Sequence, residues 1–325
     1  MVEKHWSEGV SKLSTWLSGQ VSYEDAAKIM ERVGGIHLSD SSVWRTTQGR
    51  GEKMKALEEE QSQAAQDKPV ESRQAVSEER LGAAMDGAMI NIREEGWKEL
   101  KVGCVFQIKP HTVRDERIGE DVEIGQAVKN SYVAHLGGPE TFGNKLFAEA
   151  RRRNWLHVRD TQVLGDGASW IWNLADEHFG GSHQTVDWYH AKQHLFAACL
   201  NFHPDGTPAA HRWMNTNAEL LYQGHAQRIA QNLHKAAEAQ PGADQEAGYF
   251  ENNHRRMNYM ELREQGWLMG SGVIESAAKQ FKARLAGPGM RWSRKGAERL
   301  LPITAAVLGN QFDRIWSSVY NSPQN

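Results

Sequence analysis

Three acidic residues lie where apolar segments of this chain end or are interrupted. Asp86 follows Leu-Gly-Ala-Ala-Met and precedes Gly87, and Asp166 follows Thr-Gln-Val-Leu-Gly and precedes Gly167. Glu275 follows a glycine-rich turn, in Gly-Ser-Gly-Val-Ile-Glu-Ser, at the start of a basic stretch. Because an unpaired charge is costly to remove from water, a carboxylate beside a buried segment indicates a partner. Three such carboxylates indicate a divalent metal ion, although each one alone also fits a solvated loop residue or a helix cap.

Length and composition are those of a globular protein. The chain has 325 residues, of which 39% are hydrophobic, and its net charge of −3 does not by itself indicate nucleic-acid binding. Its two cysteines, Cys104 and Cys199, are too few for a disulfide framework or a cysteine zinc site. No apolar run approaches the ~18 residues of a membrane helix, and the first residues do not resemble a signal peptide. We therefore expect a cytoplasmic protein without membrane contact.

Residues 1–66 have the pattern of a helical region. Ser22 is suited to cap one helix, and Ser39 or Ser41 is suited to cap the next, after a turn that contains glycine. Two short helices joined in this way are typical of a helix-turn-helix, which would contact DNA, although an ordinary helical hairpin has the same pattern. Residues 67–80 are polar, and we expect them to form a linker.

Strand and helix patterns alternate beyond this linker. The first apolar segment is interrupted at Asp86-Gly87, and an acid-rich stretch at 115–123 is expected to be an exposed hairpin loop between the second and third strands. The expected strands are 81–92, 97–108, 131–136, 161–164 and 183–187, and the expected helices of the same region are 140–155, 168–179, 189–202, 273–285, 295–308 and 311–320.

This order predicts an α/β fold with a mixed sheet that is flanked by helices. The first three strands can pair as an antiparallel meander, whereas the later strands alternate with helices and should be parallel. The order matches a ribonuclease-H-like layout, in which the first and fourth strands are neighbours, so that Asp86 and Asp166 meet and a later helix adds Glu275. The expected division is a helix-turn-helix-like region at 1–66, a linker at 67–80, a ribonuclease-H-like catalytic domain at 81–205 and 266–325, and an all-helical insertion at 206–265.

The three carboxylates are suited to hold a hard cation. Clustered carboxylate oxygens favour Mg²⁺ or Mn²⁺ over zinc. Two such ions about 3.5–4 Å apart can activate a water or hydroxyl and stabilise the leaving oxygen of a phosphodiester. We therefore expect Asp86, Asp166 and Glu275 to be both catalytic residues and ligands of two Mg²⁺ or Mn²⁺ ions.

The stretch after Glu275 is strongly basic. Its first part would neutralise phosphates beside the metal site, and the part after the Gly-Pro-Gly loop combines charge with a ring that can stack on a base. A solvated helix face has a similar charge pattern. The predicted DNA-binding residues are Lys279, Lys282, Arg284, Arg291, Trp292, Arg294 and Lys295.

Five strings in this order resemble the core of bacterial insertion-sequence transposases of the DDE superfamily. They are Met-Asp-Gly-Ala-Met-Ile, Gly-Asp-Gly-Ala-Ser-Trp-Ile-Trp, Val-Asp-Trp-Tyr-His-Ala, Gly-Ser-Gly-Val-Ile-Glu-Ser and Gly-Pro-Gly-Met-Arg-Trp-Ser, and the resemblance covers residues 80–317. The resemblance implies a ribonuclease-H-like catalytic domain with a helical insertion before Glu275, and it implies Asp86, Asp166 and Glu275 as the metal-binding triad. Such transposases often carry a longer amino-terminal DNA-binding region than the segment before residue 80 here.

Asp187 and His190 resemble the Asp/Cys-x-x-His signature of Mutator-like transposases. At the start of a helix they could support catalysis by holding a phosphate or by orienting a metal ligand. With His194, which is on the same helix face, they could instead form a zinc site. No glutamate follows His190, so the pattern of a zinc hydrolase is not met. A helix cap and a core histidine are a third possibility.

The function that the resemblance implies is DNA transposition by a bacterial, nucleoid-associated enzyme. Its partners would be the terminal inverted repeats of a mobile element and target DNA, and we expect a homodimer or a higher assembly on that DNA. Cleavage at the element's ends frees 3′-hydroxyls, which then attack the target. Two alternatives remain: a metal-dependent nuclease or resolvase of the same fold that only cuts, and a catalytically silent DNA-binding regulator.

Overall fold

The fold is built on a sheet of five strands. The computed structural model describes residues 6–67, 77–115 and 119–320 of the chain. In spatial order the strands are β3-β2-β1-β4-β5. Their bounds are β1 Ser77–Ile92, β2 Gly96–Asp115, β3 Glu120–Leu136, β4 Val158–Gly165 and β5 His183–Val186.

The pairing within the sheet is mixed, as the order of strands and helices predicts. β1 and β2 are antiparallel, as are β2 and β3, so the first three strands form a meander. β4 pairs in parallel with both β1 and β5. The prediction that the first and fourth strands are neighbours is therefore confirmed.

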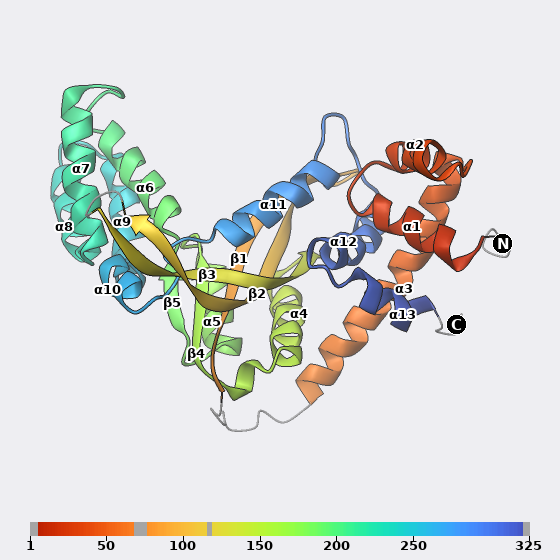
Figure 1. Cartoon of the computed structure of the whole chain (residues 1–325). Helices are drawn as coiled ribbons and strands as arrows, with labels where there is room; N and C mark the ends of the chain where they lie inside the picture. The colour runs from red at the N-terminus through yellow and green to blue at the C-terminus, as the bar shows by residue number, and fades with distance from the viewer. Residues whose placement is uncertain (1–5, 68–76, 116–118, 321–325) are drawn as a thin grey trace.

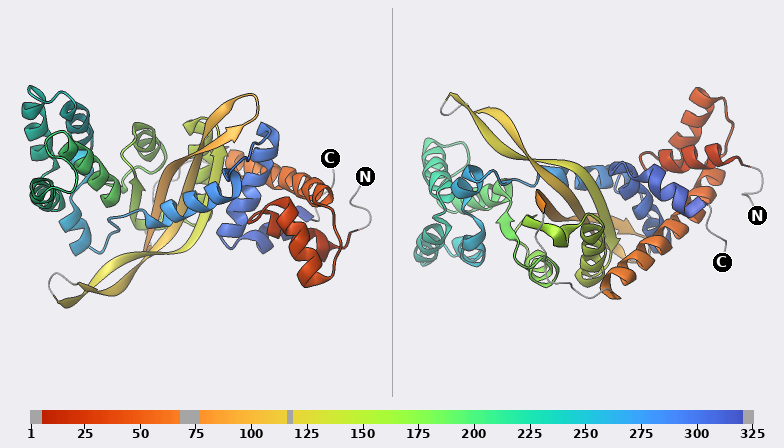
Figure 2. Two further views of the ribbon diagram at one scale, coloured as in Figure 1. Left: turned by 90° about the horizontal axis from the view of Figure 1, so that it is seen from above. Right: turned by 60° about the horizontal axis from the view of Figure 1, so that its bottom comes forward.

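Two strand boundaries differ from the predictions. β1 continues through Asp86-Gly87 without a break, because residues on both sides of this pair remain hydrogen-bonded to β2. β2 and β3 continue as a two-stranded ribbon almost to its tip, with Arg114 opposite Asp121, so the predicted loop at 115–123 is mostly strand. Residues 116–118 lie outside the described part of the chain. Figure 2 shows the ribbon projecting past the rest of the sheet.

Most helix boundaries lie within a few residues of those predicted. Ser22 caps the second helix by accepting a hydrogen bond from Asp25, as predicted. The helices are α1 Glu8–Ser18, α2 Tyr23–Gly34, α3 Asp40–Asp67, α4 Pro139–Arg152, α5 Ser169–His178, α6 Trp188–Leu200, α7 Pro208–Tyr222, α8 Ala226–Ala237, α9 Ala243–Asn253, α10 Tyr259–Glu264, α11 Gly272–Leu285, α12 Arg294–Leu308 and α13 Phe312–Tyr320, with short 3-10 helices at Trp155–His157 and His254–Arg256.

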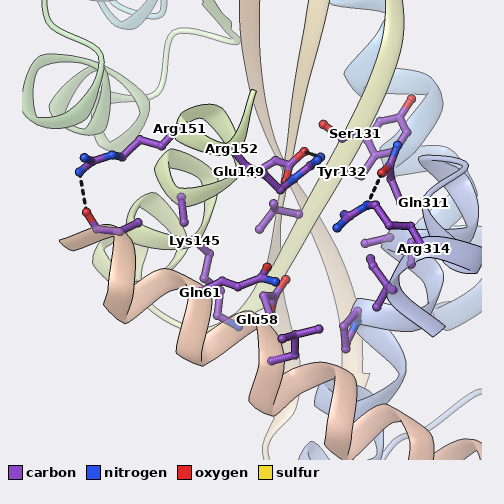
Figure 3. Close-up of a pocket in the computed structure, with 18 of the residues that line it drawn as sticks. Glu58, Gln61, Ser131, Tyr132, Lys145, Glu149, Arg151, Arg152, Gln311 and Arg314 are labelled. Carbon is purple, nitrogen blue, oxygen red and sulfur yellow. Dashed lines mark hydrogen bonds and ion pairs between the residues drawn. The ribbon is translucent and has the colours of Figure 1, made fainter. Parts of the chain in front are cut away.

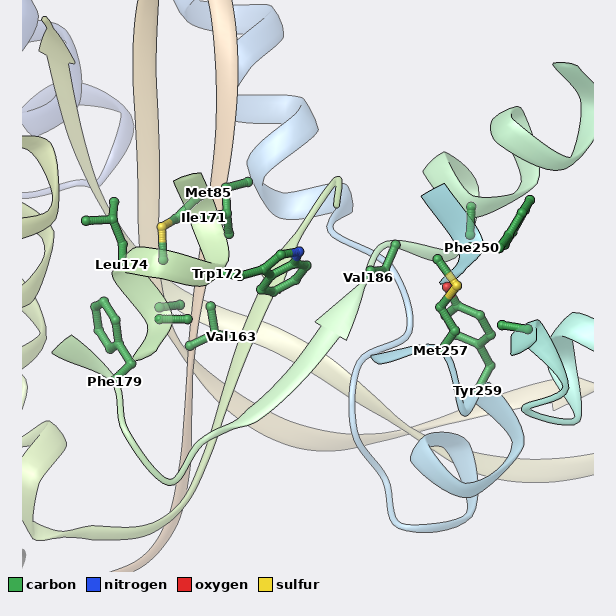
Figure 4. Close-up of a cluster of buried hydrophobic side chains, with 14 of the residues drawn as sticks. Met85, Val163, Ile171, Trp172, Leu174, Phe179, Val186, Phe250, Met257 and Tyr259 are labelled. Atoms are coloured by element: carbon green, nitrogen blue, oxygen red, sulfur yellow. The ribbon is translucent and has the colours of Figure 1, made fainter. Parts of the chain in front are cut away.

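Each face of the sheet carries its own buried cluster. On one face, β1, β2 and β3 pack against α11, α12 and α13. On the other face, α4 and α5 cover the strands, and this cluster continues into the helices of the insertion, where Phe250, Met257 and Tyr259 are buried (Figure 4). Figure 1 shows α11 crossing the sheet between the insertion and the group formed by α1, α2, α3, α12 and α13. Helices therefore flank the sheet on both faces, as predicted.

The amino-terminal region differs from a pair of short helices. Ser39 accepts a hydrogen bond from Ser42 at the start of α3, which then runs for 28 residues. This helix is long because it packs along α12 and α4 rather than ending after a few turns. Of the predicted linker at 67–80, residue 67 belongs to α3 and residues 77–80 belong to β1, while residues 68–76 lie outside the described part.

The segment between α6 and α11 is helical throughout, with short turns between its helices. Its helices α7 to α10 form a group at one end of the molecule (Figure 1). Among the described residues, none of the helices has the length and apolarity needed to cross a membrane.

Candidate active site

Asp86 lies within β1 and Asp166 directly follows β4, at matching positions of these two neighbouring strands. In the parallel pairing of β1 with β4, Ala84 is opposite Leu164. Asp86 is two residues beyond Ala84, and Asp166 is two residues beyond Leu164. Because alternate residues of a strand face the same side, Asp86 points toward α11, as Ala84 and Ala88 do.

Each of these carboxylates has one oxygen bonded to nearby backbone. Oδ1 of Asp86 accepts a hydrogen bond from the Gly87 amide at 2.7 Å, and Oδ1 of Asp166 accepts one from the Ala168 amide at 2.8 Å. Neither Oδ2 atom has a hydrogen bond among the described residues. Burial and the negative charge of Asp166 raise the pKa of Asp86, although the Gly87 amide, His190 and Lys282 oppose this effect. The site therefore favours a cation beside Asp86.

Glu275 lies in the first turn of α11, close to Asp187 and His190. Lys279, one turn later, lies with its Nζ 3.6 Å from Oε2 of Glu275. Lys282 is exposed on the same helix and is close enough to act electrostatically on Asp86. α11 therefore carries a carboxylate in its first turn and ammonium groups along its length, and Lys282 in its last turn acts on Asp86 of β1.

The tightest group of metal-ligand atoms in the described part of the chain is Asp187, His190 and Glu275. One ligand atom from each lies within 4.8 Å of the others. Asp86 and Asp166 belong to no group of three that is this compact. Asp86 and Asp166 are close enough to interact electrostatically, whereas Glu275 lies closest to the Asp187–His190 pair.

Asp187 is a fully buried carboxylate whose two oxygens both accept hydrogen bonds. Oδ1 accepts from the His190 amide at 2.8 Å, which makes Asp187 the cap of α6. Oδ2 accepts from the Ser271 hydroxyl at 2.7 Å and also from the Ser271 amide. Burial acts to raise the pKa of Asp187, but the contacts with His190 and Ser271 outweigh burial and lower it.

His190 links this pair to the other carboxylates. Its Nδ1 lies 3.3 Å from Oδ1 of Asp187, an ion-pair distance, but forms no hydrogen bond among the described residues. The contact with Asp187 raises the pKa of His190 in spite of partial burial, and the charges of Asp166 and Asp86 act in the same direction. The surrounding carboxylates therefore favour the protonated form of His190 over the neutral form.

His194 does not join Asp187 and His190 in the compact group of the described residues, because it contacts the insertion instead. Its Nδ1 lies 2.7 Å from Oε2 of Glu246, and its ring stacks on Tyr249 with centroids 3.5 Å apart. The Tyr249 hydroxyl in turn donates a hydrogen bond to the backbone oxygen of Asp166 at 2.8 Å. No sequence signal marks Tyr249 as a neighbour of the site, because more than 80 residues separate it from Asp166.

Two of the predicted DNA-binding residues contact other parts of the protein. Arg284 is only 3% exposed, and its Nε donates a hydrogen bond to the Ser18 backbone oxygen at 2.7 Å. Its guanidinium lies over the rings of Tyr23 and Trp292. The Trp292 indole donates to the Leu285 oxygen at 2.7 Å and is partly buried. The prediction for Arg284 is therefore corrected, because this buried group joins α1, α2 and α11 and does not form a surface for phosphates. The predicted role of Trp292 stays a prediction, although its ring also contacts Tyr23 and Leu285.

The remaining predicted contacts are at or near the surface. Arg294 is already bound within the protein, since it pairs with Glu95 at 2.5 Å and donates to the Leu136 oxygen at 3.1 Å. Four side chains remain exposed: Lys279, Lys282, Arg291 and Lys295.

A separate cavity of ≈ 760 Å³ lies away from these residues, between α3, α4, β3 and α13. Charged side chains line it, as Figure 3 shows. Lys145 pairs with Glu58 at 2.5 Å, and Arg152 pairs with Glu149 at 2.5 Å, so much of this charge is compensated. The cavity contains none of the sequence-predicted site residues.

No protein-family model matches this chain, and no curated protein sequence matches it significantly. The function proposed below therefore depends on the fold and on the residues at this end of the sheet.

Proposed function

We propose that this chain is a DNA transposase with a ribonuclease-H-like catalytic domain. The observation that carries the proposal is the parallel pairing of β1 with β4, which sets Asp86 beside Asp166. Glu275 supports it, because it lies close to His190, on which both aspartates act electrostatically. The sheet order and the helical segment before α11 agree with the layout expected for such an enzyme. A regulator that only binds DNA gains nothing from carboxylates placed near phosphates.

The donor set fits Mg²⁺ or Mn²⁺. Asp86, Asp166 and Glu275 offer carboxylate oxygens, and the Oδ2 atoms of the two aspartates have no hydrogen bond among the described residues. Hard oxygen donors of this kind suit these cations better than zinc. Two bound ions would supply activation of a water or 3′-hydroxyl and charge stabilisation at the scissile phosphate.

The basic side chains around these carboxylates would bind and orient the DNA. Lys279 and Lys282 project from α11 beside the carboxylates, where they would neutralise phosphates next to the scissile bond. Arg291 and Lys295 extend this positive surface beyond the turn that follows α11. His190, with its raised pKa, would add a further positive charge on the Asp166 side. Together they would hold an element end while it is cut and then joined to target DNA.

The reaction would proceed in two steps at one site. Water first attacks the phosphodiester at the element end and leaves a free 3′-hydroxyl. That hydroxyl then attacks a phosphodiester of the target DNA, and the target's own 3′-oxygen is the leaving group. We propose that two copies of the chain assemble on the two ends of the element, because both ends must be joined to one target.

The first step can be tested by cleavage of DNA that carries the sequences flanking the protein's own gene. We expect cutting with a 3′-hydroxyl product in Mg²⁺ or Mn²⁺ but not in Zn²⁺. Asp86→Ala, Asp166→Ala and Glu275→Ala should each reduce the rate by at least about 100-fold. Asp160→Asn, which changes an acidic residue at the other end of β4, should cut normally.

Three outcomes would overturn this proposal. Cutting that survives all three alanine substitutions would exclude the carboxylates as the site. Cutting supported by Zn²⁺ alone would indicate a zinc hydrolase instead. Cutting without any joining would favour the nuclease that keeps the same fold.

A further inference from the structure

The position of Glu275 depends on how the chain returns to the sheet after the helical insertion. The insertion ends at α10, and the return runs through residues 265–271 into α11. This return lies against the end of β5, where the Trp188 amide donates a hydrogen bond to the Met269 oxygen at 2.9 Å. Any shift of the return would move the first turn of α11 and its carboxylate.

Gln162 of β4 holds the first part of the return. Its side chain is fully buried. Its Nε2 donates to the Leu268 oxygen at 2.7 Å, and its Oε1 accepts from the Leu268 amide at 3.2 Å. The same Nε2 donates to the Thr185 hydroxyl of β5 at 2.9 Å, which fixes the orientation of the amide. Gln162 therefore fixes the position of the return on the sheet at Leu268, just before α11 begins.

Asp187 holds the second part through Ser271. Oδ2 of Asp187 accepts from both the amide and the hydroxyl of Ser271. The Ser271 carbonyl oxygen in turn accepts hydrogen bonds from the Ile274 amide at 2.8 Å and from the Glu275 amide at 3.0 Å. A continuous chain of hydrogen bonds thus runs from Asp187 to the backbone of Glu275.

We propose that Asp187 is the positioning residue for Glu275: it fixes the first turn of α11 against the ends of β4 and β5. This inference rests on the proposed function, because it assigns Glu275 as a metal ligand. Asp187 itself acts through Ser271, since both of its oxygens are already bonded to the protein. Partners of this kind orient metal ligands, and their loss typically weakens metal binding about 10–100-fold.

The contact needs a carboxylate. Asp187 meets the amide donors of His190 and Ser271 on its two sides, together with the Ser271 hydroxyl. An asparagine has only one oxygen, so its amino group would face one of these N–H groups. Asp187→Asn should therefore break one side of the contact while changing the shape of the side chain very little.

The test measures Mn²⁺ binding to the protein without DNA, by electron paramagnetic resonance. We expect Asp187→Asn to weaken Mn²⁺ binding about 10-fold or more. Ser271→Ala removes only the hydroxyl and should weaken it less. Ser276→Ala, the same change at an exposed position of α11, should bind as the wild type does. Each variant's thermal unfolding should remain a single cooperative transition.

A double-mutant cycle separates positioning from general damage. If Asp187 acts through Glu275, the Asp187→Asn/Glu275→Gln variant should bind Mn²⁺ about as weakly as Glu275→Gln alone. Losses that add would overturn the proposal, as would a folded Asp187→Asn protein with wild-type affinity. If Asp187→Asn does not fold, Ser271→Ala decides: unchanged Mn²⁺ binding in that variant would contradict the proposal.

A second measurement keeps the inference distinct from the proposed function. Hydrogen exchange at the amides of residues 274–279 should be faster in Asp187→Asn than in Ser276→Ala. A wild-type protein that binds no Mn²⁺ would refute the proposed function, but faster exchange would still show that Asp187 fixes α11. Unchanged exchange would refute the positioning role itself.

Discussion

Ala84 of β1 pairs with Leu164 of β4 in parallel register, and an aspartate follows each of them two residues later. This register is fixed by packing, because both strands are covered on two faces and a shift by one residue would move each side chain into the cluster on the opposite face. Asp86 and Asp166 are therefore brought together by the packing of the sheet, whatever their own charges favour. The electrostatic repulsion between them lowers the stability of the folded protein.

Asp86→Asn should stabilise the metal-free protein at neutral pH. Burial and the charge of Asp166 raise the pKa of Asp86 in the folded state. When folding raises the pKa of a carboxyl group, the folded protein loses stability as the pH rises through that pKa. At pH 7 the ionised carboxylate therefore destabilises the folded state. Removing the charge should raise the Tm by a few degrees, or about 1 kcal/mol.

Asp160→Asn is the matched comparison for this measurement. The contact with Arg159 lowers the pKa of Asp160, so the ionised form is favoured in the folded state. The pair is exposed, and its loss should change the Tm little or lower it slightly. A lower Tm in Asp86→Asn than in Asp160→Asn would contradict the assignment of repulsion to the Asp86 site.

Lys282→Ala and Arg284→Ala should affect different properties, DNA affinity and stability, although both change basic residues in the last turn of α11. Lys282 is exposed, so its loss should weaken DNA binding and reduce the salt dependence of the affinity by about one unit of slope. Arg284 is buried and bonded to Ser18, so its loss should lower the free energy of unfolding by about 2 kcal/mol or more. Titrations at several salt concentrations and denaturant unfolding would measure the two effects. An unchanged slope for Lys282→Ala would remove it from the DNA surface.

The burial of Arg284 could not be predicted from the sequence, because its partners are far away along the chain. Ser18 is separated from it by 266 residues, and Tyr23 comes from another helix. A basic residue among other basic residues looks the same whether it faces solvent or a helix end. The contact of Asp187 with Ser271 could not be predicted for a related reason, since it depends on where the chain rejoins the sheet after the helical insertion.

The sheet order could be predicted because it follows from local patterns. Strand and helix periodicities are visible over a few residues, and the alternation of later strands with helices predicts parallel pairing. The neighbouring of β1 and β4 followed from the layout that this order of elements matches. The start of α11 near Glu275 was likewise indicated by the glycine-rich turn before it. The length of the β2–β3 ribbon was missed, because its polar residues lack the alternation that marks a half-buried strand.

His135→Gln should remove part of the acid sensitivity of the protein. Burial and the charge of Lys145 lower the pKa of His135 to about 4, below its value of 6.5 in an unfolded chain. Between these values the unfolded chain takes up a proton that the folded protein does not, so stability is present above pH 6.5 and is lost as the pH falls toward 4. The wild type should lose about 2 kcal/mol more than the variant between pH 7.5 and 4.5. Denaturant unfolding at both pH values measures this, and equal losses would mean that His135 takes up its proton normally in the fold.

The most direct test of the central claim is strand transfer from DNA that has already been cut. A duplex with a free 3′-hydroxyl at the element end is incubated with the protein, Mg²⁺ and a supercoiled target plasmid. We predict joined products with the wild type and with Asp160→Asn, and none above background with Asp86→Asn, Asp166→Asn or Glu275→Gln. Joined products that persist in these three variants, or a wild-type protein that cuts the end but never joins it, would contradict the account.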